Sequence, residues 1–246
     1  MRQLTWLAAD DQDTPFPPLD SALLEPNGLI AVGGSLSPRR LQLAYRSGIF
    51  PWFSDGEPVL WWSPDPRALF LPGDLKLHRS LRKRLRHAGF KVSLDTAFEQ
   101  VMRACAEPRP TQPTTWITEA MIAAYCQLHE LGLAHSVEVW DADGLVGGLY
   151  GVSIGKGFFG ESMFSRQADA SKVALAWLAG QLWRWDFHFI DCQLPSAHLA
   201  RLGVRLVPRR EFARRLSAAG RHPDKPGPWR FDRDYTPLGA ADHDSL

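Results

Sequence analysis

Residues 136–193 constrain the fold more than any other part of this sequence. Three runs of β-prone residues at 136–140, 145–154 and 158–164 are separated by the turn residues 143–144 and 155–157, which predicts an antiparallel meander. Residues 169–185 then have the pattern of a buried helix, and 187–193 alternate as a short strand. A meander, a crossover helix and a further strand are typical of an α/β chain with a mixed sheet.

Composition places the chain among ordinary globular proteins. Its 246 residues are 45% hydrophobic and 22% charged, which excludes a disordered, collagen-like or coiled-coil chain. The most apolar stretch, 173–183, is too short to cross a membrane, and the first residues lack the apolar core of a signal peptide. Three cysteines without a CxxC pair indicate reduced thiols. We therefore expect a cytoplasmic monomer without a membrane partner, a structural zinc or a disulfide.

The first part of the chain is rich in proline, which distinguishes it from the rest. Prolines recur between residues 15 and 66, with aromatic residues between them at 48–53 and 60–67. One helix is expected there, with Ser37 as N-cap, Pro38 at its first position and Gly48 at its end. We expect a small irregular N-terminal domain at 1–65 and a larger domain at 66–246. The tail at 220–246, rich in Pro, Gly and Asp, is expected to be loose.

A basic segment stands out against a net charge of only +1. It contains seven basic residues and no acidic one: Lys76, Arg79, Arg82, Lys83, Arg84, Arg86 and Lys91. A helix over roughly 78–88 would carry most of them and create a local positive potential that suits phosphate groups. The alternative is an ordinary solvated helix face.

Common enzyme signatures are missing from the sequence. Neither GxGxxG nor GxxxxGK[ST] follows a predicted strand, so a nucleotide phosphate site is not supported. The string at 160–164 lacks the second glycine of a nucleophile elbow, which makes Ser162 a poor hydrolase nucleophile. Histidines are scattered without an HExxH spacing. We expect no metal and no cofactor.

The order of elements, together with the string HLARLGV at 198–204, resembles the GNAT acyltransferase fold. That family binds the pyrophosphate of acetyl-CoA with a Q/R-x-x-G-x-G/A turn at a helix N-terminus. Here Asp169 replaces a glycine in the corresponding residues 166–171 and brings a negative charge to that place. This favours an acyltransferase with a different donor, and an acetyl-CoA-dependent N-acetyltransferase is the alternative.

Asp191 and Gln193 form the candidate catalytic pair. Residues two apart on a strand point to the same face, so their side chains are expected side by side at the C-terminal end of strand 187–193. The carboxylate could accept a proton, and the amide could donate one hydrogen bond and accept another around a reacting amine. A strand-end aspartate that caps a loop is the structural alternative.

Glu161 lies on the third expected strand of the meander, among Phe158, Phe159, Met163 and Phe164. It faces either solvent or an apolar pocket. In a pocket, it would suit a ligand that carries a hydrophobic side chain beside an ammonium group.

Five strings resemble the leucyl/phenylalanyl-tRNA–protein transferase family, in order between about residues 15 and 217. They are EPNGLIAVGG at 25–34, GIFPWF at 48–53, WWSPDPR at 61–67, GESMFSR at 160–166 and IDCQ at 190–193. The resemblance implies a bacterial cytoplasmic enzyme with a small N-terminal domain and a GNAT-like catalytic domain. Such an enzyme moves Leu or Phe, and less readily Met, from its tRNA to a protein with N-terminal Arg or Lys. The modified protein then enters N-end rule degradation.

The same resemblance implies roles for individual residues. Trp52 and Trp116 would hold the terminal adenosine of the tRNA; Leu149, Phe158, Glu161 and Met163 would bind the aminoacyl group; Asp191 and Gln193 would be catalytic; and Arg79, Arg82, Lys83, Arg84 and Arg86 would contact the tRNA body. Phe158 and Glu161 are three apart, so they share a pocket only if Gly160 marks a bulge. Leu149 stands where the relatives carry methionine. A route in which a hydroxyl or amine of the substrate carries the proton is equally compatible with Asp191 and Gln193. A non-enzymatic tRNA-binding module is a further alternative.

Overall fold

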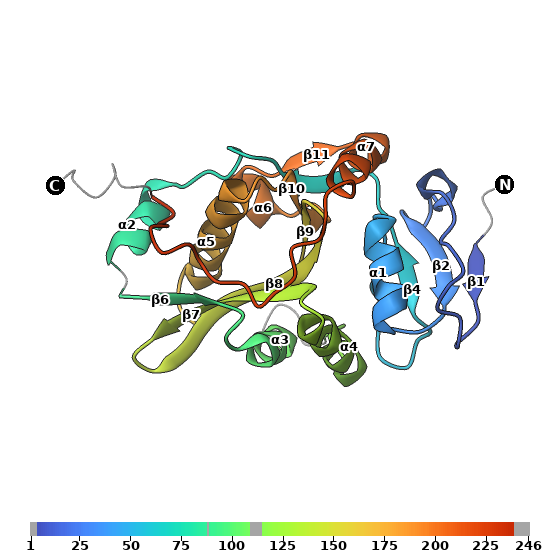
Figure 1. The fold of residues 1–246 in the computed structure, drawn as a ribbon, viewed down its shortest axis with the longest axis horizontal. Coiled ribbons are helices and arrows are strands. Elements are labelled where there is room, and N and C mark those ends of the chain that lie inside the picture. The colour runs from blue at the N-terminus through green and yellow to red at the C-terminus, as the bar shows by residue number, and fades with distance from the viewer. Residues whose placement is uncertain (1–3, 88, 109–114, 239–246) are drawn as a thin grey trace.

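Two β-sheets with covering helices make up the computed structural model, which describes residues 4–87, 89–108 and 115–238 (Figure 1). The strands are β1 (Thr5–Leu7), β2 (Leu29–Gly33), β3 (Phe50–Pro51), β4 (Leu60–Trp62), β5 (Arg67–Phe70), β6 (Lys91–Leu94), β7 (Ala134–Asp141), β8 (Gly144–Ile154), β9 (Gly157–Ser165), β10 (Phe189–Gln193) and β11 (Arg205–Val207). The helices are α1 (Pro38–Arg46), α2 (Arg79–His87), α3 (Phe98–Ala106), α4 (Glu119–Glu130), α5 (Ala170–Arg184), α6 (Ala197–Leu202) and α7 (Arg209–Ala219), with a 3-10 turn η1 (Leu19–Ser21).

The larger sheet contains the predicted meander, crossover helix and following strand, together with β5 and β6, which the sequence did not predict. Its order is β11-β5-β10-β9-β8-β7-β6, in which β7, β8 and β9 are the predicted meander. β9 and β10 are parallel and are joined by α5, the predicted crossover helix, while the other neighbouring pairs are antiparallel. Helices α3 and α4 cover one face, and α5 covers the other (Figure 1). The expectation of an α/β chain with a mixed sheet is confirmed.

The N-terminal part is more regular than the sequence predicts. β1, β2, β4 and β3 form a four-stranded sheet in that order, although each strand is at most five residues long. Such short strands between prolines show too few alternations to be recognised. The helix predicted after Ser37 is α1, and the Ser37 side chain accepts a hydrogen bond from the backbone N–H of Arg40. The division at residue 65 stays a prediction, although β4 and β5 on either side of it belong to different sheets.

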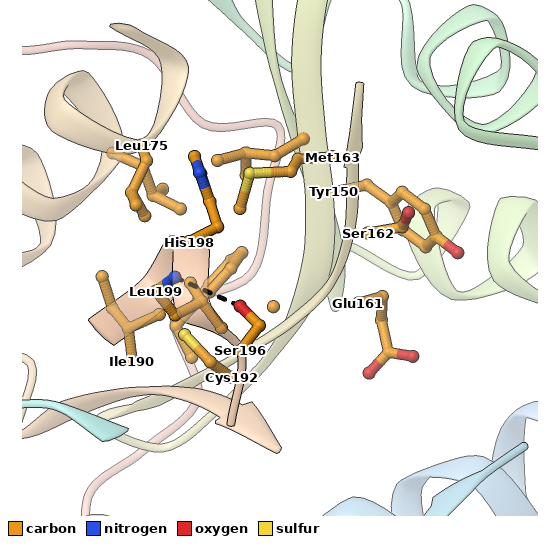
Figure 2. A pocket seen from close by; sticks show the side chains of 14 residues that line it. Tyr150, Glu161, Ser162, Met163, Leu175, Ile190, Cys192, Ser196, His198 and Leu199 are labelled. Carbon is orange, nitrogen blue, oxygen red and sulfur yellow. Dashed lines mark hydrogen bonds between the residues drawn. The ribbon is translucent and has the colours of Figure 1, made fainter. Parts of the chain in front are cut away.

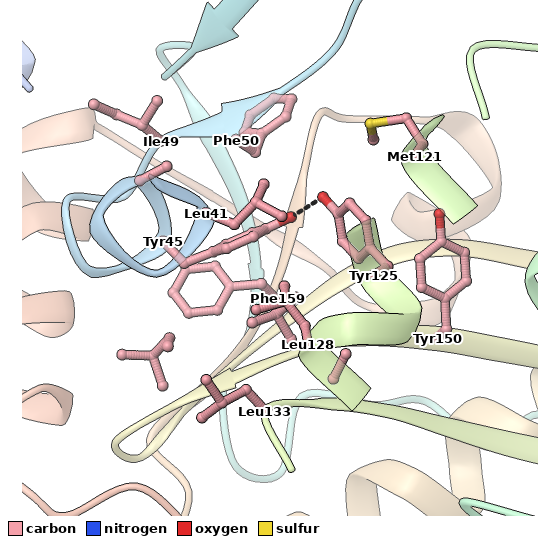
Figure 3. Packing of buried hydrophobic residues seen from close by; sticks show 14 of the residues in the cluster. Leu41, Tyr45, Ile49, Phe50, Met121, Tyr125, Leu128, Leu133, Tyr150 and Phe159 are labelled. Atoms are coloured by element: carbon pink, nitrogen blue, oxygen red, sulfur yellow. Dashed lines mark hydrogen bonds between the residues drawn. The ribbon is translucent and has the colours of Figure 1, made fainter. Parts of the chain in front are cut away.

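One apolar core joins the N-terminal part to the larger sheet. Tyr45 of α1 and Phe50 of β3 pack in the same buried cluster as Tyr125 of α4 and Phe159 of β9 (Figure 3). These four side chains are at most 4% exposed. The N-terminal residues therefore contribute directly to the environment of β9.

Residues 221–238 pack against the molecule, which differs from the expectation of a loose tail. Trp229 is 2% exposed and Tyr235 is 7% exposed, so two aromatic side chains anchor the segment despite its Pro, Gly and Asp content. Residues 239–246 lie outside the described residues. Within the described part of the chain, no helix is both long enough and apolar enough to span a membrane.

Candidate active site

A β-bulge in β9 brings the predicted pocket residues to one cavity. Tyr150 of β8 pairs with Ser162, but the next residue, Gly151, pairs with Gly160, which leaves Glu161 as the extra residue. The bulge changes the alternation of the strand, so Phe158 and Glu161 line the same cavity. Of the two possibilities left by their spacing, the structure contains the bulge.

The first cavity is largely apolar and has a volume of about 260 Å³ (Figure 2). Its apolar lining is Leu149, Phe158, Met163, Leu175, Leu178, Ile190 and Leu199, and its polar lining is Tyr150, Glu161, Ser162, Cys192, Ser196 and His198, with Gly160. In Figure 2 Glu161 lies to one side of the apolar group formed by Met163, Leu175, Ile190 and Leu199. All four residues expected to bind the aminoacyl group therefore line this cavity, and the acid lies at its edge.

A second cavity of about 200 Å³ adjoins the first through Glu161. It is lined by Phe50, Pro51, Trp52, Trp116, Glu161, Gln193 and Leu194. Trp52 follows β3, and Trp116 precedes α4, so the two expected indoles come from distant parts of the chain to one hollow. The indole N–H of Trp62 donates to the backbone oxygen of Trp52 at 2.7 Å and fixes that segment.

Hydrogen bonds hold the Glu161 carboxylate between the two cavities. Gln193 Nε2 donates to Oε1 at 2.7 Å, and the hydroxyl of Tyr125 donates to Oε2 at 3.3 Å. The Tyr125 hydroxyl is also bonded to that of Tyr45 from α1 (Figure 3). Burial raises the pKa of Glu161 to about 7, while the hydrogen bonds from its neighbours act in the opposite direction. This acid therefore changes charge near neutral pH.

The His198 and Cys192 side chains of the first cavity stay neutral at that pH. Burial, with the nearby cations Lys172 and Arg201, lowers the pKa of His198. Burial also raises the pKa of the Cys192 thiol. Both shifts favour the uncharged form, so the cavity offers an apolar surface with one titrating acid at its edge.

The Asp191 carboxylate pairs with Arg67 and not with the Gln193 side chain, which differs from the side-by-side pair that the sequence predicts. This carboxylate accepts hydrogen bonds from Arg67 Nε at 2.9 and 3.1 Å and from Arg67 Nη2 at 2.7 Å, and both side chains are fully buried. Asp191 lines neither cavity, although its Oδ1 also accepts from the backbone N–H of Gln193 at 2.8 Å.

The different direction of Gln193 has a backbone cause. Its φ is +61°, in the left-handed region, and the pairing of β10 with β5 shifts between Asp191 and Gln193. Regular alternation therefore ends at Asp191, and the amide turns toward Glu161. Sequence reasoning missed Arg67, Tyr45 and Tyr125 in the site. A buried aspartate needs a cation as its partner, and this need was the only signal in the sequence that could have pointed to Arg67.

The basic residues lie apart from the two cavities. Arg79, Arg82, Lys83 and Arg86 are exposed on α2, Arg84 is half-buried, and Leu81 on the same helix is buried. Helix α2 packs near α5 and lies at the opposite end of the molecule from the N-terminal sheet (Figure 1). The structure therefore provides a basic surface on α2 but does not bring it to the cavity residues.

Asp169, the acidic residue that disfavours the binding of coenzyme A, lies at the start of α5. Asp169 is the N-cap residue with a φ of +65°, and its carboxylate forms an ion pair with Lys172 at 2.6 Å. A carboxylate near a helix N-terminus disfavours the approach of a phosphate, because both groups are negatively charged. Among the residues that the structure describes, no group of three or more His, Cys, Asp and Glu side chains could hold a metal ion.

The family models and the similar proteins of known name point to the same family. The family model "Leucyl/phenylalanyl-tRNA protein transferase" matches residues 69–217, and the model of its N-terminal domain matches residues 34–65. A relative of that name from Alkalilimnicola ehrlichii is 56% identical over 239 residues, which cover 97% of this chain and 93% of the relative. One from Nitrosomonas europaea is 56% identical over 223 residues, with 91% and 94% covered.

Similarity to solved structures is much weaker. A GCN5-related N-acetyltransferase from Kribbella flavida matches at 12% identity and a TM-score of 0.36, covering 68% of this chain and 59% of the other. The L-PGS structure from Bacillus licheniformis matches at 9% identity and a TM-score of 0.36, covering 68% and 53%.

Proposed function

Because the chain belongs to the leucyl/phenylalanyl-tRNA–protein transferase family, we propose that its two adjoining cavities bind the charged end of the tRNA. The protein is an aminoacyltransferase whose substrates are an aminoacyl-tRNA and an acceptor protein. The proposal concerns which residues bind these substrates and how the transfer takes place.

The donor fits the two cavities in one orientation. The side chain of the transferred Leu, Phe or Met would occupy the apolar cavity, in contact with Leu149, Phe158 and Met163. The terminal adenosine would lie in the second cavity against Trp52 and Trp116. The ester between the amino acid and the ribose then lies beside Glu161, because this residue is common to both cavities. That shared position is the observation that supports the proposal most strongly.

The reaction is an attack of a free amine on an activated ester. The acceptor α-amine forms a bond to the ester carbonyl carbon, and the bond from that carbon to the ribose oxygen breaks. The proton that the amine loses passes to this oxygen, which leaves as a ribose hydroxyl. Neither a metal nor a nucleotide is required, since the ester supplies the free energy. Alignment of the two reactants alone can contribute on the order of 7 kcal/mol or more.

Glu161 and Gln193 are the groups placed to act on the reacting atoms. We propose that ionised Glu161 takes the proton from the attacking amine and that the Gln193 amide orients that amine. Asp191 remains in the catalytic unit as a positioning residue, since it holds the Gln193 backbone while Arg67 holds its carboxylate. This assignment replaces direct proton acceptance by Asp191, whose buried side chain does not reach either cavity.

The acceptor is proposed to carry N-terminal Arg or Lys, so that the product enters N-end rule degradation. We place the reaction in the cytoplasm, where charged tRNA is available, and expect a monomer without a cofactor. The test is transfer of labelled Phe or Leu from tRNA to a protein with N-terminal Arg. A protein with N-terminal Glu is the control. Labelling of the first acceptor alone is expected, and no labelling by correctly folded protein would refute the proposal.

The same assay separates the two alternatives. An acetyl-CoA-dependent N-acetyltransferase would bind acetyl-CoA in calorimetry and leave charged tRNA unchanged. A non-enzymatic tRNA-binding module would bind tRNA with the same affinity whether it carries Leu, Phe or an acidic amino acid.

Removal of either indole of the second cavity is expected to raise the KM for charged tRNA. Trp52→Ala and Trp116→Ala each lose a stacking surface that contributes about 1–3 kcal/mol, which corresponds to roughly 5- to 150-fold in KM. Trp6→Ala is the matched control, because Trp6 is 74% exposed and lines neither cavity. A KM in either cavity variant equal to that of Trp6→Ala would contradict the adenosine assignment.

The basic surface of α2 is expected to determine the salt dependence of tRNA binding. Each phosphate contact contributes about 0.7–0.9 to the slope of log affinity against log salt, so Arg79→Gln with Lys83→Gln should reduce the slope by roughly 1.5. Arg210→Gln with Arg214→Gln removes the same charge from the exposed face of α7 and should leave the slope near that of the parent. Equal slopes for the two double variants would contradict a role for α2.

A further inference from the structure

The C-terminal segment 225–238, called here the strap, passes α5 and is hydrogen-bonded to it (Figure 1). The Tyr235 hydroxyl donates to the backbone oxygen of Trp177 at 3.0 Å. Gln181 and Asp232 exchange two hydrogen bonds of 2.9 Å, one through the Asp232 backbone N–H. Leu175 and Leu178, also on α5, line the apolar cavity. The strap therefore contacts a helix that forms one wall of the proposed amino-acid site.

Trp229 anchors the strap against the larger sheet, and its side chain has little freedom to move. Its backbone N–H donates to Asp95 Oδ2 at 2.6 Å, and its indole N–H donates to the backbone oxygen of Lys225 at 2.9 Å. Its ring stacks on His135, with the ring centroids 3.5 Å apart and an angle of 6° between the planes. Since the side chain is 2% exposed, the position of the ring is determined on all sides by the protein.

The Trp229 ring also packs against Phe158, which lines the apolar cavity. Their centroids are 6.2 Å apart, with 40° between the planes. Trp229 itself does not line the cavity, so it contacts Phe158 from behind. Gly151 of β8 also confines the Phe158 ring. The ring lies so close to this glycine that a Cβ there would be 2.6 Å from Phe158 Cε1. Phe158 is fully buried and cannot move toward Trp229 while the indole is present.

We propose that Trp229 is a positioning residue for the amino-acid cavity, which holds Phe158 from behind and thereby sets the depth of the cavity and its selectivity between Leu and Phe. This inference rests on the proposed donor site. Without the indole, Phe158 gains space to withdraw and the cavity becomes deeper. A leucine side chain then loses contacts with the wall, whereas the longer phenylalanine side chain keeps more of them.

The test is the steady-state kinetics of Trp229→Leu with Leu-tRNA and Phe-tRNA as donors. We expect the KM for Leu-tRNA to rise on the order of tenfold, the KM for Phe-tRNA to rise less, and kcat to stay the same. A purely structural role would instead lower the fraction of active enzyme, which reduces kcat equally for both donors and leaves both KM values unchanged.

Two further variants keep the test decisive. Trp229→Phe preserves an aromatic ring and should shift the Leu-to-Phe ratio in the same direction by a smaller factor, and it replaces Trp229→Leu if that variant does not fold. Tyr235→Phe breaks the hydrogen bond to α5 without touching Phe158 and should leave the ratio unchanged. A folded Trp229 variant with the parental ratio would overturn the inference. Failure of the parent to use either donor would instead overturn the proposed function.

Discussion

Replacement of Asp191 by asparagine is expected to lower the free energy of unfolding by about 3–5 kcal/mol, although the two side chains have nearly the same shape. The substitution leaves the Arg67 guanidinium buried without a counter-charge. Both partners are fully buried, and among the residues that the structure describes Arg67 Nη1 has no hydrogen-bond partner, so none of them offers another acceptor. The rings of Phe50 and Phe212 remain near the cation, at 5.0 and 4.4 Å. Urea unfolding at pH 7 measures the difference.

A double variant separates the ion pair from the shape of the site. Arg67→Met with Asp191→Leu removes both charges, and replacement of a buried pair by apolar residues is often neutral or stabilising. We expect this variant to recover most of the stability but not the activity, because Gln193 loses the carboxylate that holds its backbone. Glu119→Gln, at an exposed ion pair with Arg103, is the control and should have little effect. An asparagine variant as stable as the parent would contradict a structural role for the pair.

Replacement of Glu161 by glutamine is expected to reduce kcat by about 10²–10⁴-fold, the usual contribution of a proton acceptor. The parent should gain activity as the pH rises through about 7, where the Glu161 carboxyl ionises according to its pKa. The variant should lose this rise and keep only the dependence from the acceptor α-amine, whose ordinary pKa is about 8. The pH profile of kcat with Phe-tRNA measures both effects. A profile with the same rise in parent and variant would assign the proton to a group of the substrate.

The same substitution is expected to have a stabilising effect that depends on pH. The folded protein holds the Glu161 proton more tightly than the unfolded chain, because its pKa is raised from 4.5 to about 7. The contribution of Glu161 to the free energy of unfolding is therefore fully present below pH 4.5 and is lost as the pH rises through 7. The stability of the glutamine variant relative to the parent should grow by up to about 3 kcal/mol between pH 4 and pH 8. A constant difference across this range would contradict the raised pKa.

Local sequence signals predicted the elements that local interactions determine. The turns at 143–144 and 155–157 define the meander, and Ser37 with Pro38 defines the start of α1. The N-terminal sheet was missed, because its strands depend on pairing between residues up to 33 positions apart in the sequence, such as Leu29 with Trp62. For residues 221–238, composition also does not reveal that Trp229 finds a buried position beside His135.

The candidate site also contains features that local sequence signals do not predict. The resemblance pointed to the cavity residues and the two indoles, and the structure brings them together around Glu161. Strand alternation failed at Gln193, because the rule assumes a regular strand and this residue adopts a positive φ. Arg67 lies 124 residues from Asp191, so the pairing that determines the role of Asp191 is determined by tertiary structure alone.

A crystal structure with bound puromycin tests the central claim most directly, namely that the two cavities form one donor site. Puromycin joins an adenosine to an aromatic amino acid and so resembles the charged end of the tRNA. We predict its aromatic ring among Leu149, Phe158 and Met163, its base against Trp52 and Trp116, and its linkage beside Glu161. Binding at another surface, or a base remote from both indoles, would contradict the claim.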